Sequence, residues 1–174
     1  MGRLRLSWAV TTTPDAPPDA GPSIRPAERA DLLDVSRIER RSFDDAWPFG
    51  QFEEFLGEPG FLVAVSGGRV VGYVVADTIA NRGQPMGHVK DLAVHPAWRG
   101  RGVATRLLDR ALAVLEVAGA RRAKLEVRQT NDDAISLYRR FGFEPHHLIS
   151  RYYDDGEAAA VFLVDLAERW RPGG

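Results

Sequence analysis

The sequence predicts one α/β domain with a mixed, mostly antiparallel sheet of about seven strands and about four flanking helices. Two local signals support this prediction most strongly. Residues 61–80 form two β-rich runs joined by Ser-Gly-Gly at 66–68, a hairpin in which glycine supplies positive φ. From Val103, apolar residues recur at helical spacing until Gly119, which indicates an amphipathic helix.

Composition limits the classes of function. The 174 residues include 44% hydrophobic and 27% charged residues, as expected for a single globular domain. No apolar run approaches the roughly 20 residues that cross a bilayer. The net charge of −1, from 23 basic and 24 acidic residues, provides no overall field to attract nucleic acid or an anionic membrane. Neither is expected as a partner.

The chain has no cysteine. Disulfides and zinc-thiolate sites are therefore excluded, which fits an intracellular protein, and a cytoplasmic location is expected. The first residues lack the apolar core of a secretory signal and are interrupted by prolines. We expect a flexible tail at 1–22, the folded domain at 23–168 and a second tail at 169–174.

Before the hairpin, the sequence predicts a short strand at Ile24 and two helices. The first helix has an approximate apolar face, formed by Leu32, Leu33, Val35 and Ile38. The second is a short helix after Pro48, running through Phe52 and Phe55.

After the hairpin, "GHVKDLAVHP" predicts a strand that ends at Pro96 and is followed by the long helix. "RRAKLEVRQ" alternates polar and apolar residues, so it predicts a strand whose polar face carries Lys124, Glu126 and Arg128. A helix capped by Asn131 follows. "FEPHHLISRYY" and "AAAVFLVDL" predict two last strands around the turn at 155–156.

The stretch "HPAWRGRGVATRLL" places two glycines and several arginines where the strand meets the long helix. Outward-pointing N–H groups and a helix N-terminus together form an anion pocket, most naturally for phosphate. A Walker loop would need a lysine after the glycines, and a dinucleotide fingerprint would need a third glycine where Thr105 stands. Neither motif is present.

Arg99-x-x-Gly102-x-Ala104 resembles the [RQ]-x-x-G-x-[GA] loop of the GCN5-related N-acetyltransferases. "LEVRQTNDDAISLYRRFGFEP" is similar to the second signature of that family, and the similarity runs from about residue 24 to 166. The resemblance is closest to the RimI-type alanine N-acetyltransferases and the related catalytic subunits of N-terminal acetyltransferase complexes. "RYYDDGEAAAVFLVDL" resembles the end of that subgroup.

The resemblance implies acetyl-CoA as cofactor. The amides of the glycine turn would hold its pyrophosphate, Asn131 would reach the pantetheine arm, and the splayed strand before the turn would pair with pantetheine and supply an N–H to the oxyanion. The residues expected to bind the cofactor are Leu92, Ala93, Val94, Arg99, Arg101, Gly102, Val103, Ala104, Thr105, Asn131 and Tyr138.

Two residues are candidates for proton transfer. The resemblance implies that Glu126 takes the proton of the substrate ammonium and that Tyr138 returns one to the thiolate. Each has a structural alternative. Glu126 is also placed to form an ion pair with Lys124 or Arg128, and Tyr138 is also placed to be a core residue with its hydroxyl at the surface.

For the acceptor, a groove lined by Phe43, Trp47, Tyr152 and Tyr153 is expected, with Asp44 or Asp45 holding the α-ammonium. The alternative is that these residues pack a helix corner against a hairpin. The four histidines match no ligand spacing, so no metal site is expected.

The leading functional prediction is acetyl transfer to the N-terminal α-amino group of a protein or peptide. Ala or Ser is the expected first residue of the acceptor, and a ribosomal protein is among the expected acceptors. Attack would be direct, in a ternary complex, because no cysteine is present to carry the acetyl group. An auxiliary subunit is left open. The alternatives are an enzyme for small amines such as polyamines or aminoglycosides, and a coenzyme A-binding partner subunit with little chemistry of its own.

Overall fold

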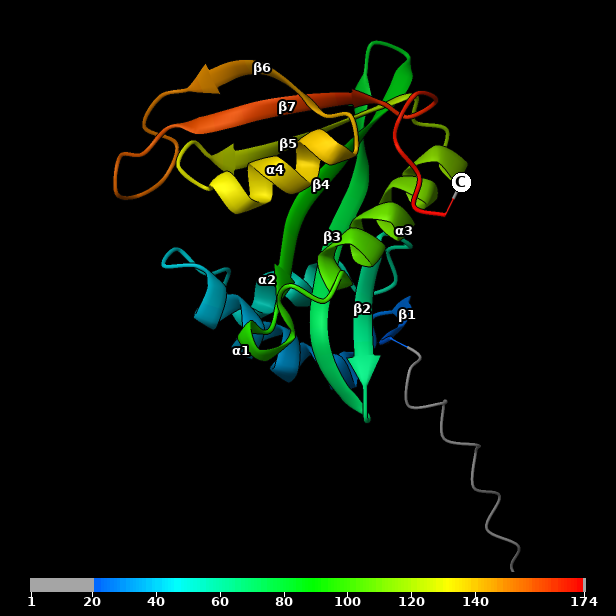
Figure 1. Cartoon of the computed structure of the whole chain (residues 1–174), viewed down its shortest axis with the longest axis vertical. Helices are drawn as coiled ribbons and strands as arrows, with labels where there is room; N and C mark the ends of the chain where they lie inside the picture. Colours follow the sequence, from blue (N-terminus) through cyan, green and yellow to red (C-terminus); the bar gives the residue numbers. More distant parts are fainter. Residues whose placement is uncertain (1–20, 174) are drawn as a thin grey trace, which may run out of the picture.

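One seven-stranded sheet organises the chain, in the order β1-β2-β3-β4-β5-β7-β6 (Figure 1). The computed structural model describes residues 21–173, so residues 1–20 of the expected N-terminal tail lie outside it. The strands are β1 Ser23–Pro26, β2 Phe61–Ser66, β3 Arg69–Asn81, β4 Gln84–Val94, β5 Arg122–Arg128, β6 Glu144–Ile149 and β7 Ala159–Asp165. The expected α/β architecture is confirmed.

Four α-helices cover the sheet: α1 Leu32–Ser42, α2 Phe49–Glu54, α3 Val103–Val117 and α4 Asp132–Arg140. Two 3-10 turns, η1 Arg29–Asp31 and η2 Pro96–Trp98, precede α1 and the glycine turn. None of the helices within residues 21–173 has both the length and the apolarity to span a membrane.

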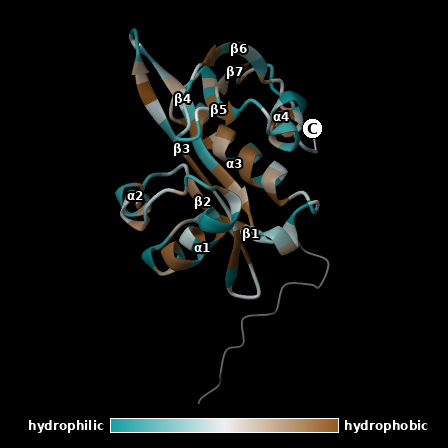
Figure 2. Cartoon of the chain, turned by 90° about the vertical axis from the view of Figure 1, so that its left-hand side faces the viewer, coloured by the Kyte–Doolittle hydropathy of each residue, from teal (hydrophilic) through white to brown (hydrophobic). Residues whose placement is uncertain are grey.

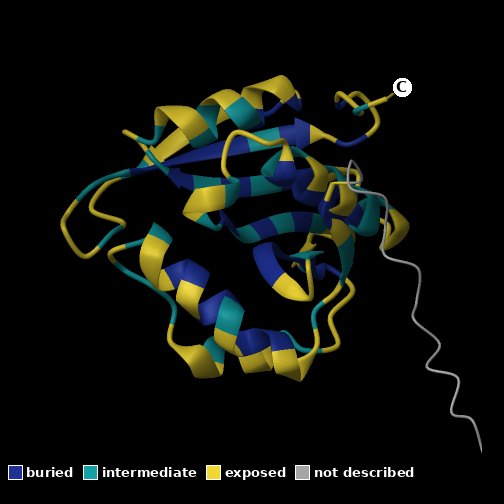
Figure 3. Cartoon of the chain, turned by 60° about the horizontal axis from the view of Figure 1, so that its bottom comes forward, coloured by how far each residue is buried: buried dark blue, intermediate teal, exposed yellow. Residues whose placement is uncertain are grey.

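Side-chain alternation along the strands creates two cores, one on each face of the sheet (Figure 2). On β2, Leu62 and Ala64 pack towards α3, whereas Phe61 and Val63 pack towards α1 and α2. The buried residues follow the strands and the inner sides of the helices, and exposed residues mark the outer sides (Figure 3). Helix α3 thus covers one face of β2, β3 and β4, and α1 and α2 cover the other.

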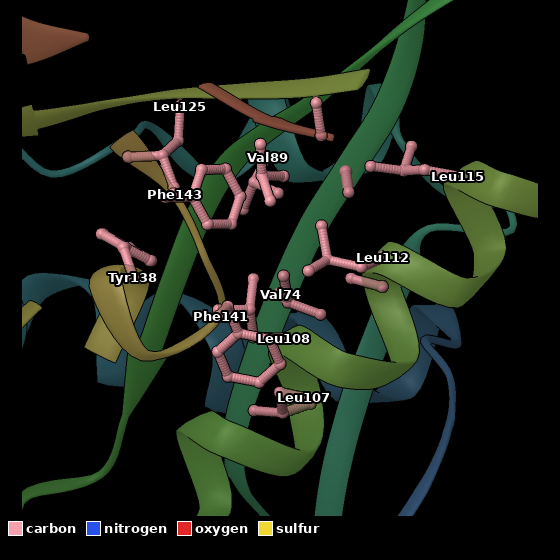
Figure 4. Packing of buried hydrophobic residues seen from close by; sticks show 14 of the residues in the cluster. Val74, Val89, Leu107, Leu108, Leu112, Leu115, Leu125, Tyr138, Phe141 and Phe143 are labelled. Carbon is pink, nitrogen blue, oxygen red and sulfur yellow. The ribbon is translucent and has the colours of Figure 1, made fainter. Parts of the chain in front are cut away.

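Helix α3 supplies the centre of the larger core, as its spacing predicts. Its buried residues include Leu107, Leu108, Leu112 and Leu115, which face Val74, Phe141 and Phe143 from β3 and the segment after α4 (Figure 4). Val117, at the end of the helix, is 91% exposed.

The β4–β5 gap is the feature that positions the site. The two strands pair in parallel only over Gly87–Val89 and Ala123–Leu125. Immediately afterwards the β3–β4 register skips Lys90, which is an extra residue on β4. Such a bulge bends its strand and increases its twist, and β4 and β5 diverge beyond it (Figure 1).

Two expectations about elements are wrong. Leu33 is 51% exposed, because it follows Leu32 by about 100° around α1 and the core side is already occupied by Leu32 and Val35. The strand expected to extend through residues 151–153 ends at Ile149. The chain then turns, with Arg151 at φ +52°.

The C-terminal segment after residue 168 is packed against the domain. Arg169 is 5% exposed and donates to Asp109 Oδ1 at 2.7 Å and Glu116 Oε2 at 3.3 Å on α3. Trp170 stacks edge to face on Phe141. Packing therefore continues beyond the boundary expected at residue 168.

Leu112→Ala tests the larger core. Leu112 is fully buried, and truncating such a residue costs about 2–5 kcal/mol because a cavity remains. Val117→Ala on the same helix should change stability by less than about 0.5 kcal/mol. Chemical denaturation measures both. Equal losses for the two variants would contradict the packing described for α3.

Candidate active site

A cavity of about 440 Å³ lies at the β4–β5 gap. We call it the gap cavity. Its walls come from β4 and β5, from the loop between α1 and α2, from the start of α4 and from the loop between β6 and β7. It combines aromatic side chains with five carboxylates, of Glu39, Asp45, Asp91, Glu126 and Asp154.

Glu126 and His88 form a close pair in the gap cavity. His88 Nε2 lies 2.6 Å from Glu126 Oε2, and Lys124 Nζ donates to Glu126 Oε1 at 2.9 Å. The Glu126 side chain is only 11% exposed. Burial alone would raise its pKa, but the hydrogen bonds and charges of His88 and Lys124 outweigh burial and lower the pKa to about 2. Glu126 is therefore ionised at neutral pH.

Three buried polar side chains form a carboxyl cluster beside this pair: Glu39, Tyr73 and Asp91. The Tyr73 hydroxyl contacts Glu39 Oε2 and lies 2.9 Å from Asp91 Oδ2. One hydroxyl has one proton to donate, so the two carboxyl groups compete for the same donor. Burial raises the pKa of Glu39, and burial together with the Glu39 charge raises that of Asp91 well above its usual range.

The carboxyl cluster also fixes the loop between α1 and α2. Glu39 Oε1 accepts the backbone N–H of Trp47 at 2.7 Å, and the Trp47 ring stacks on Phe55 with centroids 5.7 Å apart. One wall of the gap cavity is thus held by a buried side chain of α1.

Tyr138 and Asn131 come together at the start of α4. The Tyr138 ring is buried, edge to face on Phe143, while the residue lines the gap cavity. Burial raises the pKa of Tyr138 above the usual 10, so the hydroxyl keeps its proton at neutral pH. Asn131 Oδ1 accepts the Ala134 N–H at 3.2 Å, which confirms it as the N-cap of α4.

Beyond the bulge, β4 presents unpaired backbone to the gap. The His95 N–H donates to Val71 O on the β3 side. Successive N–H groups of a strand point to opposite edges, so the N–H groups of Val94 and Leu92 point into the gap. Ala93, between them, packs its side chain in the core beneath α1.

The glycine turn lies between the end of β4 and the start of α3, where the sequence places it. Gly100 and Gly102 have φ of +71° and +77°, and a Cβ at either position would meet no atom within 4 Å. Gly102 is the N-cap of α3, so the first-turn N–H groups of Val103, Ala104 and Thr105 have no partner within the helix. They lie beside open space and form an anion-binding end.

The two arginines of the turn already have contacts. Arg99 Nε donates to Val94 O at 3.0 Å, and its Nη2 donates to Ser42 Oγ at 3.2 Å. The Arg101 guanidinium lies 4.9 Å from the Trp98 ring centroid. Arg99 thereby ties the end of β4 to α1, while its phosphate role stays a prediction.

Arg128 joins the two loops on either side of the gap cavity. Its guanidinium donates to Asp45 at 3.1 Å in the α1–α2 loop and to Asp155 and Glu157, both at 2.8 Å, in the β6–β7 loop. The same group lies 4.0 Å from the ring centroid of Tyr153. These hydrogen bonds hold the pKa of Arg128 above its usual value. We call these contacts the Arg128 network.

Five of the six residues expected to bind the acceptor line the gap cavity: Phe43, Asp45, Trp47, Tyr152 and Tyr153. Asp44 is exposed and is not among the lining residues. Asp45 lines the gap cavity, but its carboxylate is occupied by Arg128. Lys124, not Arg128, is the ion-pair partner of Glu126 on β5.

The sequence reasoning missed Glu39, His88 and Asp91 as site residues. Glu39 carried a signal, since it follows Leu32 and Val35 at helical spacing and an acid at a core position needs a partner. His88 is a polar residue between apolar ones on β4, as Glu126 is on β5. The two are neighbours only because β4 and β5 are adjacent in the sheet.

Comparison with known proteins gives a consistent result. The sequence profile of the Acetyltransferase (GNAT) family matches residues 32–143. An N-alpha-acetyltransferase of Sulfolobus acidocaldarius is 36% identical over 158 residues, covering 82% of this chain and 92% of that protein. N-alpha-acetyltransferase RimI of Mycobacterium tuberculosis is 36% identical over 129 residues, covering 72% and 80%. The crystal structure of Ard1 from Thermoplasma volcanium has a TM-score of 0.78 at 26% identity, covering 84% and 98%.

Arg128→Met tests whether the Arg128 network holds the two loops together. Removing the guanidinium leaves three neighbouring carboxylates without their shared cation, so amides at 45–47 and 152–157 should exchange with solvent about tenfold faster, while α3 amides stay unchanged. Hydrogen exchange measured by mass spectrometry gives the rates. As a control, Arg37→Met removes a surface pair with Asp34 and should alter neither loop. Unchanged loop exchange in Arg128→Met would contradict this role.

Proposed function

Because the chain belongs to the Acetyltransferase (GNAT) family, we propose that it transfers acetyl from acetyl-CoA to the N-terminal α-amino group of a protein or peptide. One observation supports this most directly. An ionised carboxylate paired with a histidine, Glu126 with His88, lines an aromatic cavity at the open edge of β4. An amine that enters this cavity meets a proton acceptor beside free backbone donors.

The residues present fit acetyl-CoA. The open glycine turn at the α3 N-terminus suits a pyrophosphate, and the free β4 edge suits an amide-rich pantetheine arm. Asn131, at the start of α4, lines the same cavity. Bound acetyl-CoA supplies an activated acetyl thioester and a thiolate leaving group. The N–H groups of Leu92 and Val94 are available to an oxyanion.

The 2.6 Å contact between Glu126 Oε2 and His88 Nε2 gives both residues a role in removing the proton of the acceptor ammonium. An imidazole is a stronger base than a carboxylate. In its neutral form His88 can donate one ring N–H to Glu126 and accept the proton at its other ring nitrogen, directly or through water. Glu126 then orients the ring and stabilises the imidazolium, as a buried carboxylate does in a catalytic triad.

Tyr138 supplies the proton that the departing thiolate needs. Its hydroxyl stays protonated at neutral pH because burial raises its pKa, so it can donate a hydrogen bond to the sulfur as negative charge develops there. The ring belongs to the core and the residue lines the gap cavity. The structural and the catalytic readings of this tyrosine are therefore compatible.

The acceptor site favours a cationic amine on a short chain. Five carboxylates and only two cations, Lys90 and Arg128, line the gap cavity. Phe43, Trp47, Tyr152 and Tyr153 give it aromatic walls, which suit the first residues of a peptide. Ala or Ser as first residue, a ribosomal protein as acceptor, an auxiliary subunit and a cytoplasmic location are the finer parts of this proposal.

An acetyl-transfer assay tests the reaction. We expect transfer from acetyl-CoA to peptides with a free α-amine, and little to the same peptides with a blocked N-terminus and an internal lysine, or to polyamines. Glu126→Gln, His88→Gln and Tyr138→Phe should each lower kcat by about 10²-fold or more without weakening acetyl-CoA binding. As a matched control, His95→Gln changes a histidine that does not line the gap cavity and should keep the rate.

Two results would contradict the proposal. Equal activity on polyamines or on blocked lysine peptides would assign the enzyme to a different acceptor. Acetyl-CoA binding with no transfer to any amine, and no effect of the three substitutions on any measured rate, would favour a coenzyme A-binding partner subunit.

Gly102→Ala tests the glycine turn as the cofactor site. A side chain at φ +77° costs about 1–2 kcal/mol. Relief of that strain would rotate the N–H groups in the first turn of α3 away from the bound anion. Gly68→Ala introduces the same strain at φ +73°, also into open space, in the β2–β3 hairpin. Both variants should lose similar stability, but only Gly102→Ala should weaken acetyl-CoA binding, by about tenfold or more. Calorimetry measures both quantities, and equal affinities would contradict the assignment.

A further inference from the structure

A second hollow, of about 620 Å³, adjoins the gap cavity along β5. We call it the β5–β6 groove. It runs between the β3–β4 hairpin tip and the outer face of β5, β7 and β6. Its cationic and titratable lining residues are Arg82, Arg122, Lys124, Glu126, His146 and His147. Glu126 also lines the gap cavity, so the two hollows meet at the proposed site of proton transfer.

The β5–β6 groove is basic although the whole chain is not. Three permanent cations, Arg82, Arg122 and Lys124, face a single carboxylate, that of Glu126. Lys124 already pairs with that carboxylate. The ion pairs found within residues 21–173 give neither Arg82 nor Arg122 an acidic partner. Asp165 lies opposite Arg122 across β5 and β7 but forms no ion pair with it, so both guanidinium groups can still contact an anionic ligand.

The floor of the groove is apolar and flat, because it is the surface of the sheet. Glu126 on β5 lies opposite Val161 on β7, which lies opposite His147 on β6. In the next row Lys124 lies opposite Leu163. Val161 is only 3% exposed, so Leu163 provides the apolar contact for an extended chain whose other side chains reach the basic rim.

Arg82 occupies an unusual backbone position for its residue type. It is the first residue of the two-residue turn between β3 and β4, at φ +44°, where asparagine or glycine is preferred. A long side chain in this conformation costs free energy. The turn nevertheless places a cation at the mouth of the groove.

We propose that the β5–β6 groove binds the acceptor beyond its first residues and selects acidic side chains there. This inference rests on the proposed function, because it takes the acceptor amine to lie at Glu126 and His88. From Glu126 to Arg122 is four residues of β5, about 13 Å, and an extended peptide advances by about 3.3 Å per residue. Residues 3 to 5 of the acceptor therefore reach the basic rim.

The neighbouring hollow limits the selected segment. Beyond Arg122 the next depression is lined by Glu144, Asp165 and Glu168. Acidic residues further along the acceptor would meet like charge there. The preference for acids should accordingly be confined to about residues 3 to 5.

Acceptor peptides that differ only in charge test the proposal. Three peptides share residues 1, 2 and 6 onwards and carry Asp, Asn or Lys at residues 3–5. We expect kcat/KM for acetyl transfer to fall in the order Asp, Asn, Lys, with about tenfold or more between the first and last. The difference should shrink at high salt, because the guanidinium groups are exposed. Equal kcat/KM on the three peptides would overturn the proposal.

Charge reversal in the groove provides the second test. Arg82→Glu combined with Arg122→Glu should reverse the order of the three peptides. The control, Arg69→Glu combined with Arg121→Glu, makes the same change of net charge at two exposed arginines outside the groove and should leave the order unchanged. The same reversal in the control would indicate an effect of net charge and overturn the proposal.

The outcomes separate this inference from the function on which it rests. If no peptide is acetylated at its α-amine, the proposed function fails. If all peptides are acetylated equally, only the groove assignment fails. Inhibition of the wild type, but not of the doubly reversed variant, by an RNA oligonucleotide would assign the groove to nucleic acid and would also overturn the proposal.

Discussion

The separation of β4 from β5 is the constraint on which the rest of the site depends. Parallel pairing stops after three residues, at the point where Lys90 is inserted as a bulge. Backbone donors that would otherwise be used in the sheet are therefore left free. The N-cap of α4 after β5 lines this opening, and the glycine turn follows the end of β4. A cofactor can add to the sheet edge there without breaking any existing pairing.

Charge at this opening is arranged in two different ways. Glu126 has cationic or donating partners and is ionised, with a pKa of about 2. Glu39 and Asp91 share one tyrosine hydroxyl. Burial raises the pKa of both carboxyl groups. The first arrangement provides a fixed negative charge beside His88, as proton transfer from an amine requires. The second holds the α1–α2 loop through Trp47 without placing a full second charge nearby.

The sequence predicted elements better than partners. The hairpin at 66–68 and the Asn131 cap follow from local chemistry, and each has the expected form. Glu126 was found through strand alternation and family resemblance, but its pairing with His88 was missed because 38 residues separate them. Leu33 and the segment at 151–153 were misassigned, since a local apolar or β-rich pattern does not reveal which side faces the core or where pairing ends.

The sequence by itself determined the order of strands and helices, the anion-binding turn and the family, because these depend on residues close together in the chain. Only the tertiary structure decided which side chains share protons and charges. Arg128 joins two loops that lie 83 and 29 residues away from it in the chain, and the β5–β6 groove combines a hairpin tip with two distant strands. Electrostatic interactions depend on distance and burial in space, and both are set by the order in which the strands pair.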